Sequence, residues 1–220
     1  MSEHGHDGIG SAGDSHNHRE HHDGQRTDEG GGSEGEGGDG DGEGHDHEHD
    51  HEHEHDHHHD HDVSDLGVGI VTVSTSRSIE DDPAGDAIRD AFEDGGHQVT
   101  VRELIDDSFD GVQSTVNRLV DRDDVDIVVT TGGTGVTPDD VTVEAVADLM
   151  HKTLPGFGEL FRRLSYDEIG TRVVGTRTTA GIADHTPVFC LPGSENAARL
   201  GAEEILVPEA PHLAGLATRE

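Results

Sequence analysis

The apolar residues of this 220-residue chain are distributed very unevenly, and this limits what can fold. Residues 1–62 contain only three of them, Met1, Ile9 and Ala12, but 16 of the 20 histidines and 20 of the 49 acidic residues. Such a segment cannot bury enough apolar surface to offset the conformational entropy lost on folding. We therefore predict a disordered, acidic, His-rich tail over 1–62 and one folded domain over 63–220.

The hydrophobic pattern of the folded part predicts strands that alternate with helices. Short apolar, β-branched runs predict buried strands at 66–73, 98–103, 126–131 and 187–191. Apolar residues spaced three and four apart predict helices at 84–92, 112–120, 143–150 and 198–206. This alternation favours an α/β fold around a mostly parallel sheet, with ligands bound beyond the carboxyl ends of the strands.

Composition excludes several classes of protein. No apolar run approaches the roughly 20 residues that a membrane helix needs, and the polar, acidic start is unlike a secretory signal. The single cysteine, Cys190, allows no internal disulfide, which suits a cytoplasmic protein, and its apolar neighbours predict a buried, inert thiol. With 49 acidic against 14 basic residues, non-specific binding to nucleic acid is not expected.

The charge of the folded part also constrains its environment. Residues 63–220 carry 29 acidic residues and 12 cations, and Lys152 is the only lysine of the chain. A domain with a net charge of −17 repels itself in ordinary buffer, whereas molar salt shortens the Debye length to about 3 Å. Acidic surfaces with almost no lysine resemble those of proteins from extreme halophiles, so we expect a protein adapted to high salt.

Two loops are candidate anion sites. The loop after the third predicted strand reads TTGGTGVTPDDVT, from Thr130 to Thr142, and matches neither a Walker A loop nor a dinucleotide fingerprint. Its three glycines allow close approach of a ligand to backbone N–H groups, and Thr142 is a candidate N-cap of the next helix. The second loop, LPGS at 191–194, follows the fourth strand. From the residues alone, a structural turn explains either loop as well as an anion site does.

Three motifs in this order resemble the MoaB/MogA family of molybdenum-cofactor biosynthesis proteins. They are TTGGTGVTPDDVT, then LPGFGELFRRLSYDEIG at 154–170, then LPGS. The resemblance covers about residues 65–211. It implies a three-layer α/β fold, a homotrimer and molybdopterin binding. In MogA-like members it also implies adenylylation of the terminal phosphate of molybdopterin by Mg-ATP, followed by metal insertion on a partner protein.

The resemblance also implies roles for individual residues. Asp140 in the D-V-T element and Asp107 in an L-I-x-D pattern correspond to two catalytic carboxylates that hold Mg²⁺, with Asp106 as a rival to Asp107. Carboxylate oxygens are ligands that Mg²⁺ prefers, and such transfers depend mainly on positioning and charge neutralisation. Thr75 departs from the family, where an acidic residue is frequent. The implied substrate-binding residues are Ser74, Arg77, Thr131, Gly132, Gly133, Thr134, Gly135, Glu159, Pro192, Gly193 and Ser194.

Two alternative functions stay open at this point. The first is a non-catalytic carrier or scaffold that binds molybdopterin without transferring an adenylyl group. The second is a related domain of the competence-damage (CinA) type, a group that tends to carry G-G-L-G where this chain has GGTG at 132–135.

The tail predicts a separate property. Residues 45–62 interleave ten histidines with eight acidic residues, which provides many overlapping sets of nitrogen and oxygen ligands for Cu²⁺, Ni²⁺ or Zn²⁺. Acidic residues alone would make the tail soluble, so the histidines favour metal binding, and a metal store or donor beside the pterin site is possible on this basis. The candidate ligands are His45, His47, His49, His51, His53, His55, His57, His58, His59 and His61.

Overall fold

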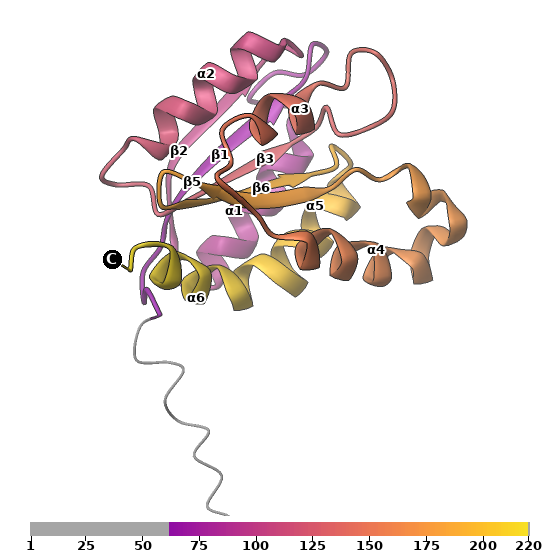
Figure 1. The fold of residues 1–220 in the computed structure, drawn as a ribbon. Coiled ribbons are helices and arrows are strands. Elements are labelled where there is room, and N and C mark those ends of the chain that lie inside the picture. Colours follow the sequence, from indigo (N-terminus) through magenta and orange to yellow (C-terminus); the bar gives the residue numbers. More distant parts are fainter. Residues whose placement is uncertain (1–61, 220) are drawn as a thin grey trace, which may run out of the picture. The chain divides into compact units, whose positions relative to one another are not determined.

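The computed structural model describes residues 62–219, so the histidines predicted to bind metal lie outside the described residues. The described part contains a six-stranded sheet with the strand order β2-β1-β3-β6-β5-β4 (Figure 1). Strands β2, β1, β3 and β6 are parallel, and at one edge β5 pairs antiparallel with both β6 and β4. The strands are β1 Gly67–Val73, β2 Gln98–Ile105, β3 Ile127–Thr131, β4 Lys152–Thr153, β5 Thr179–Ala183 and β6 Thr186–Leu191.

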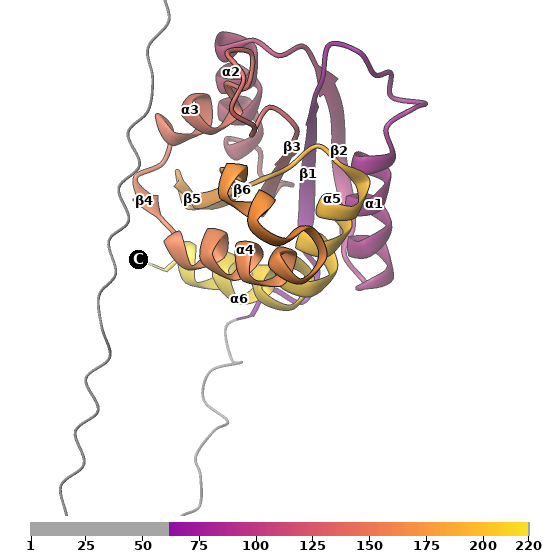
Figure 2. The same cartoon turned by 90° about the vertical axis from the view of Figure 1, so that its right-hand side faces the viewer.

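Helices cover both faces of this sheet, which confirms the three-layer α/β fold. Helices α1, α4, α5 and α6 pack on one face, and α2 and α3 pack on the other (Figures 1 and 2). A 3₁₀ segment, η1, follows α4, and a π-helical turn, η2, joins α5 to α6. The bounds are α1 Pro83–Asp94, α2 Phe109–Val120, α3 Thr142–Ala147, α4 Pro155–Ile169, η1 Gly170–Gly175, α5 Glu195–Gly201, η2 Ala202–Leu206 and α6 Val207–Ala217.

Strand β1 shows why these residues form a buried central strand. Val68 and Ile70 belong to the core layer shared with α1, while Val71 and Val73 belong to the layer shared with α2. All four side chains are at most 3% exposed. A strand buried on both faces needs apolar residues at nearly every position, as the run LGVGIVTV has.

Several predicted details differ from the structure. The helix predicted at 143–150 is α3, and Val141, not Thr142, occupies its N-cap position. Thr142 is the first residue of the helix, and its buried hydroxyl makes no hydrogen bond and so does not cap the helix. The antiparallel strands β4 and β5 were not predicted, because two exposed residues and the small-residue run TAGIA lack the apolar, β-branched pattern of the other strands.

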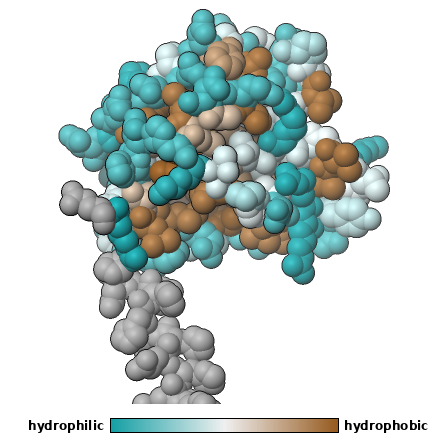
Figure 3. All heavy atoms as spheres, in the orientation of Figure 1, coloured by the Kyte–Doolittle hydropathy of each residue, from teal (hydrophilic) through white to brown (hydrophobic). Residues whose placement is uncertain are grey.

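Cys190 lies in β6 and is completely buried. Burial raises the pKa of its thiol to about 12, which confirms the predicted inert cysteine. In the described residues, no helix is long and apolar enough to cross a membrane. On the face shown in Figure 3, hydrophilic residues dominate and hydrophobic ones form separate patches.

The topology defines where a ligand can bind. Strand β1 pairs with β2 on one side and with β3 on the other, and the strand order reverses at this point. Helix α1, which follows β1, packs on one face of the sheet, and α3, which follows β3, packs on the opposite face. The loops that follow β1 and β3 therefore diverge, and a crevice forms at the carboxyl ends of these strands.

Candidate active site

The two loops predicted as anion sites are in direct contact. The Gly132 backbone N–H donates to the Leu191 carbonyl oxygen at 3.1 Å, and the Thr131 hydroxyl donates to the Pro192 carbonyl oxygen at 2.9 Å. A methyl group at Gly193 would lie 3.1 Å from the Gly132 Cα. The glycine-rich loop and the LPGS loop therefore form one continuous wall.

Gly132 and Gly133 give this wall its conformation. Their φ angles are +99° and +63°, values that side-chain-bearing residues rarely adopt. A Cβ at Gly132 would lie 2.2 Å from the Val73 carbonyl oxygen at the end of β1. The glycine loop can pass over the sheet edge only because no side chain is present there.

We expect Gly132→Ala to destabilise the domain by about 3 kcal/mol or to prevent folding, because it adds both a backbone clash and an unfavourable φ. Gly175→Ala is the matched control, because Gly175 lines the same cleft but a Cβ there meets no atom within 4 Å. The control should change stability by less than about 0.5 kcal/mol. Urea unfolding of both variants measures the difference, and equal stabilities would contradict the predicted clash.

A cleft of about 590 Å³ opens between the two loops and η1 with the residue that follows it. It brings together most of the residues predicted to bind substrate. Thr131 lies beneath the wall, fully buried. The cleft is lined by Arg77, Gly132, Gly133, Thr134, Gly135, Asp140, Arg172, Gly175, Thr176, Pro192, Gly193 and Ser194.

Two arginines give the cleft its cationic character. Arg77 donates from Nη2 to the Gly193 carbonyl oxygen at 2.9 Å, and its Nη1 lies 3.8 Å from a carboxylate oxygen of Asp82. The exposed side chain of Arg172 makes no hydrogen bond or ion pair within residues 62–219. In so acidic a domain, two guanidinium groups beside backbone N–H groups favour an anionic ligand.

Asp140 lies at the boundary of two cavities. It also lines a second cavity, of about 610 Å³, with Phe109, Val136 and Arg177 among the other lining residues. One of its carboxylate oxygens accepts hydrogen bonds from the Thr137 backbone N–H at 2.8 Å and the Thr137 hydroxyl at 2.6 Å.

The environment of Asp140 keeps its carboxylate ionised. Partial burial raises its pKa, but the hydrogen bonds from Thr137 and Gly135 and the charge of Arg177 outweigh this effect. The pKa of Asp140 therefore lies below its usual range. A negative charge is held where the two cavities meet.

Arg177 holds the glycine-rich loop around this carboxylate. Its Nε donates to the Gly135 carbonyl oxygen at 2.6 Å, and its Nη2 donates to the Asp140 carbonyl oxygen at 2.8 Å. Its third nitrogen pairs with the carboxylate of Glu144 on α3. Arg172, Thr176 and Arg177 lie in no recognised motif and are not among the predicted site residues. The scarcity of cations in this chain is the one sequence signal that could have identified the two arginines as candidate site residues.

Four predicted residues lie apart from these two cavities. Asp107 follows β2, is half-buried and lines neither cavity, although Phe109, two residues later, lines the second one. Asp106 is exposed and lines neither cavity. The hydroxyl of Ser74 accepts a hydrogen bond from the Ser76 backbone N–H at 3.3 Å, and Ser74 does not border the cleft. Glu159 is exposed on α4, outside both cavities.

The acidic residues suit a metal ion that arrives with a phosphate ligand. Within residues 62–219, no three histidine, cysteine or acidic side chains are grouped closely enough to hold an ion on their own. Asp140 nevertheless offers an ionised carboxylate beside the cationic cleft. Mg²⁺ commonly takes one or two protein carboxylates and completes its shell with substrate phosphates and water, so a Mg-nucleotide fits this arrangement.

Fold and cleft together define an α/β protein with an arginine-lined cleft at the carboxyl edge of the parallel strands. Residues 69–212 match the family described as "Probable molybdopterin binding domain". The chain belongs to this family of molybdenum-cofactor biosynthesis proteins, and the resemblance to MoaB and MogA is confirmed.

Individual relatives are similar over most of their own length. The molybdenum cofactor biosynthesis protein B of Bacillus anthracis is 41% identical over 144 residues, which is 65% of this chain and 85% of that protein. A crystal structure of a molybdenum cofactor biosynthesis protein B is 38% identical with a TM-score of 0.69, covering 71% of this chain and 98% of that one. The tungsten cofactor synthesizing protein MoaB from Pyrococcus furiosus is 34% identical with a TM-score of 0.62, covering 70% and 98%. The homotrimer and the metal-insertion partner stay predictions.

Proposed function

We propose that this protein binds molybdopterin and transfers the adenylyl group of Mg-ATP to its terminal phosphate. The observation that carries this proposal is the position of Asp140, an ionised carboxylate shared by a cationic cleft and a second cavity. Two adjoining cavities suit two substrates, and a charge where they meet suits a metal-bound triphosphate.

The proposed reaction balances as a nucleotidyl transfer. An oxygen of the molybdopterin phosphate forms a bond to the α-phosphorus of ATP, and the bond from that phosphorus to pyrophosphate breaks. Adenylylated molybdopterin and pyrophosphate are the products. Magnesium, when bound, neutralises charge on the triphosphate and on the leaving pyrophosphate.

The residues of the chain would then act by binding and orientation. Arg77 and Arg172 would bind the molybdopterin phosphate, together with N–H groups of the glycine-rich loop. Asp140 would hold the magnesium ion, while Arg177 fixes the loop that carries Asp140. The apolar side chains of Phe109, Val136 and Pro138 in the second cavity suit the heteroaromatic base of a nucleotide.

The direct test is incubation of the full chain with molybdopterin, Mg²⁺ and ATP in high KCl, followed by detection of adenylylated molybdopterin and pyrophosphate. Parallel reactions without Mg²⁺ and without molybdopterin should give no product. Molybdopterin binding with no product would favour the non-catalytic carrier, a function that the position of Asp107 outside both cavities also favours. Absence of binding would contradict both functions.

We also propose that residues 45–62 bind several transition-metal ions, with Cu²⁺ bound more tightly than Ni²⁺ and Ni²⁺ more tightly than Co²⁺. Because neutral imidazole is the ligand, binding should weaken as the pH falls through about 6.5. Calorimetric titration of the full chain and of a chain beginning at Val63 tests this, and only the full chain should bind several ions. Equal binding by both would show that the tail acts only on solubility.

Adenylyl transfer should survive the truncation, because no family motif lies in the tail.

A further inference from the structure

The buried carboxylate of Asp82 lies close to the cleft but does not line it, so it is not placed to contact a ligand there. Asp82 is 0% exposed and occupies the N-cap position of α1. Its Oδ1 accepts a hydrogen bond from the Gly85 backbone N–H at 3.1 Å, and its Oδ2 accepts one from the Thr72 hydroxyl at 2.6 Å. The strand β1 and the first turn of α1 therefore fix the orientation of this carboxylate.

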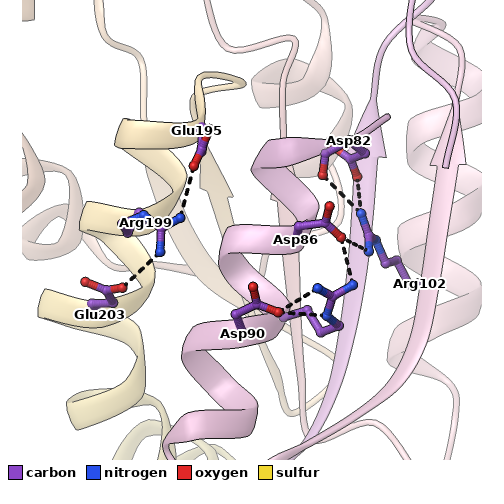
Figure 4. Close-up of polar contacts among 8 residues, drawn as sticks. Asp82, Asp86, Asp90, Arg102, Glu195, Arg199 and Glu203 are labelled. Carbon is purple, nitrogen blue, oxygen red and sulfur yellow. Dashed lines mark hydrogen bonds and ion pairs between the residues drawn. The ribbon is translucent and has the colours of Figure 1, made fainter. Parts of the chain in front are cut away.

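Two arginines from different elements lie close to the Asp82 carboxylate. Arg102 reaches from β2 and donates from Nη2 to Asp82 Oδ2 at 2.9 Å, while its Nη1 donates to Asp86 at 2.6 Å (Figure 4). Arg77, from the loop after β1, places its Nη1 3.8 Å from Asp82 Oδ1. Asp82 thus connects an arginine anchored in the fold to an arginine that lines the cleft.

Helix capping alone does not account for a carboxylate at this position. Asparagine or serine caps a helix about as well, and a buried charge is costly unless it is well paired. Burial raises the pKa of Asp82, but the hydrogen bonds from Thr72 and Arg102 outweigh it and leave the pKa below its usual range. A Cβ at Gly85 would lie 2.1 Å from Asp82 Oδ2, so the helix leaves space for the carboxylate by having glycine there.

We propose that Asp82 is a positioning residue that holds Arg77 at the phosphate end of the cleft. Arg77 contacts the Asp82 carboxylate and the Gly193 carbonyl oxygen and also lines the cleft, so these two contacts limit the orientation of its planar guanidinium. The inference rests on the proposed function, because the anion that Arg77 binds is taken to be the phosphate of molybdopterin.

Electrostatics and positioning predict opposite signs for the same change. Asp82→Asn removes a negative charge next to Arg77, and by charge alone the cleft would then attract an anion more strongly. If Asp82 instead orients Arg77, the same change weakens anion binding, because the guanidinium loses its fixed direction. The sign of the change in affinity therefore separates the two effects.

We expect Asp82→Asn to raise the Kd for molybdopterin about tenfold, the scale of losing one hydrogen bond between charged groups. Asp86→Asn is the matched control, because Asp86 pairs with the same Arg102 but makes no contact with Arg77. The control should bind molybdopterin as the unmodified chain does or slightly more tightly. Unchanged or tighter binding by Asp82→Asn would overturn the positioning role of Asp82 and leave the proposed function intact. A wild-type chain that fails to bind molybdopterin would overturn both the positioning role and the proposed function.

A double-mutant cycle tests whether Asp82 acts through Arg77. In a chain that carries Arg77→Ala, the further change Asp82→Asn should have less than about a twofold effect on the Kd, because the group it positions is gone. Equal effects in both backgrounds would show a merely structural role. Should Asp82→Asn fail to fold, Thr72→Val removes one bond that orients the carboxylate and should raise the Kd about threefold. No change in that variant would overturn the inference as well.

Discussion

Asp140→Asn is expected to lower the rate of adenylyl transfer at least about 100-fold while molybdopterin binding stays nearly unchanged. The asparagine keeps the size of the side chain and can still accept the hydrogen bonds that Thr137 donates. The ionised charge beside both cavities is lost, and with it the group that would hold a metal ion against the triphosphate. The measurement is single-turnover formation of adenylylated molybdopterin beside a separate binding titration.

Asp139→Asn is the matched control for this change. Asp139 is the neighbouring acidic residue, is exposed and lines neither cavity, so its replacement should leave the rate of transfer unchanged. A wild-type rate for Asp140→Asn, in a preparation whose unmodified chain is active, would remove Asp140 from the mechanism. Equal losses in the two variants would point to a general effect of charge on this loop.

The second predicted carboxylate is tested in the same assay. The family resemblance assigns Asp107, and Asp107→Asn should reduce transfer more than binding, with Asp106→Asn as the control for register. Asp107 follows β2 and does not line the second cavity, whereas Phe109, two residues later in the sequence, does. If Asp106 matters and Asp107 does not, the assignment is off by one residue. If neither these two nor Asp140 matters, the carrier function is favoured.

The local features of the site were predictable because short segments determine them. Gly132 and Gly133 adopt left-handed backbone angles that favour glycine, and the LPGS turn follows a strand whose apolar pattern is plain. Strand β1 was predictable for a similar reason, because a central strand buried on both faces leaves a continuous apolar run.

The residues that were missed depend on contacts distant in sequence. Arg177 lies between η1 and β5 and reaches the carbonyl oxygen of Gly135, 42 positions away. Pro83 at the first helical position marks Asp82 as a helix cap in the sequence, but the contact of Asp82 with Arg102 spans 20 positions. The N-cap prediction for Thr142 was wrong because the helix begins one residue earlier than expected and the Thr142 hydroxyl makes no hydrogen bond. Such pairings follow from the packing of the sheet and not from local pattern.

Raising KCl from 0.1 M to 3 M is expected to increase the midpoint of thermal unfolding by about 10 °C. Residues 63–220 carry 29 acidic residues and 12 cations, and the resulting repulsion is relieved when the Debye length falls from about 10 Å to below 3 Å. Screening also weakens the ion pairs on the surface, but exposed pairs contribute only about 0–1 kcal/mol each. For a domain of this size, a 10 °C shift of the midpoint corresponds to a change of roughly 3–4 kcal/mol in the free energy of unfolding.

A charge-reduced variant separates screening from the general effect of concentrated salt on apolar surfaces. Glu93, Asp123, Asp167 and Glu204 are exposed and form no ion pair within residues 62–219. Replacing all four with their amides should raise the midpoint in 0.1 M KCl and reduce the shift produced by 3 M KCl. Salting-out would shift both chains equally, because the apolar core is the same. A midpoint that does not change with KCl in the unmodified chain would contradict adaptation to high salt, since net repulsion would then not limit its stability.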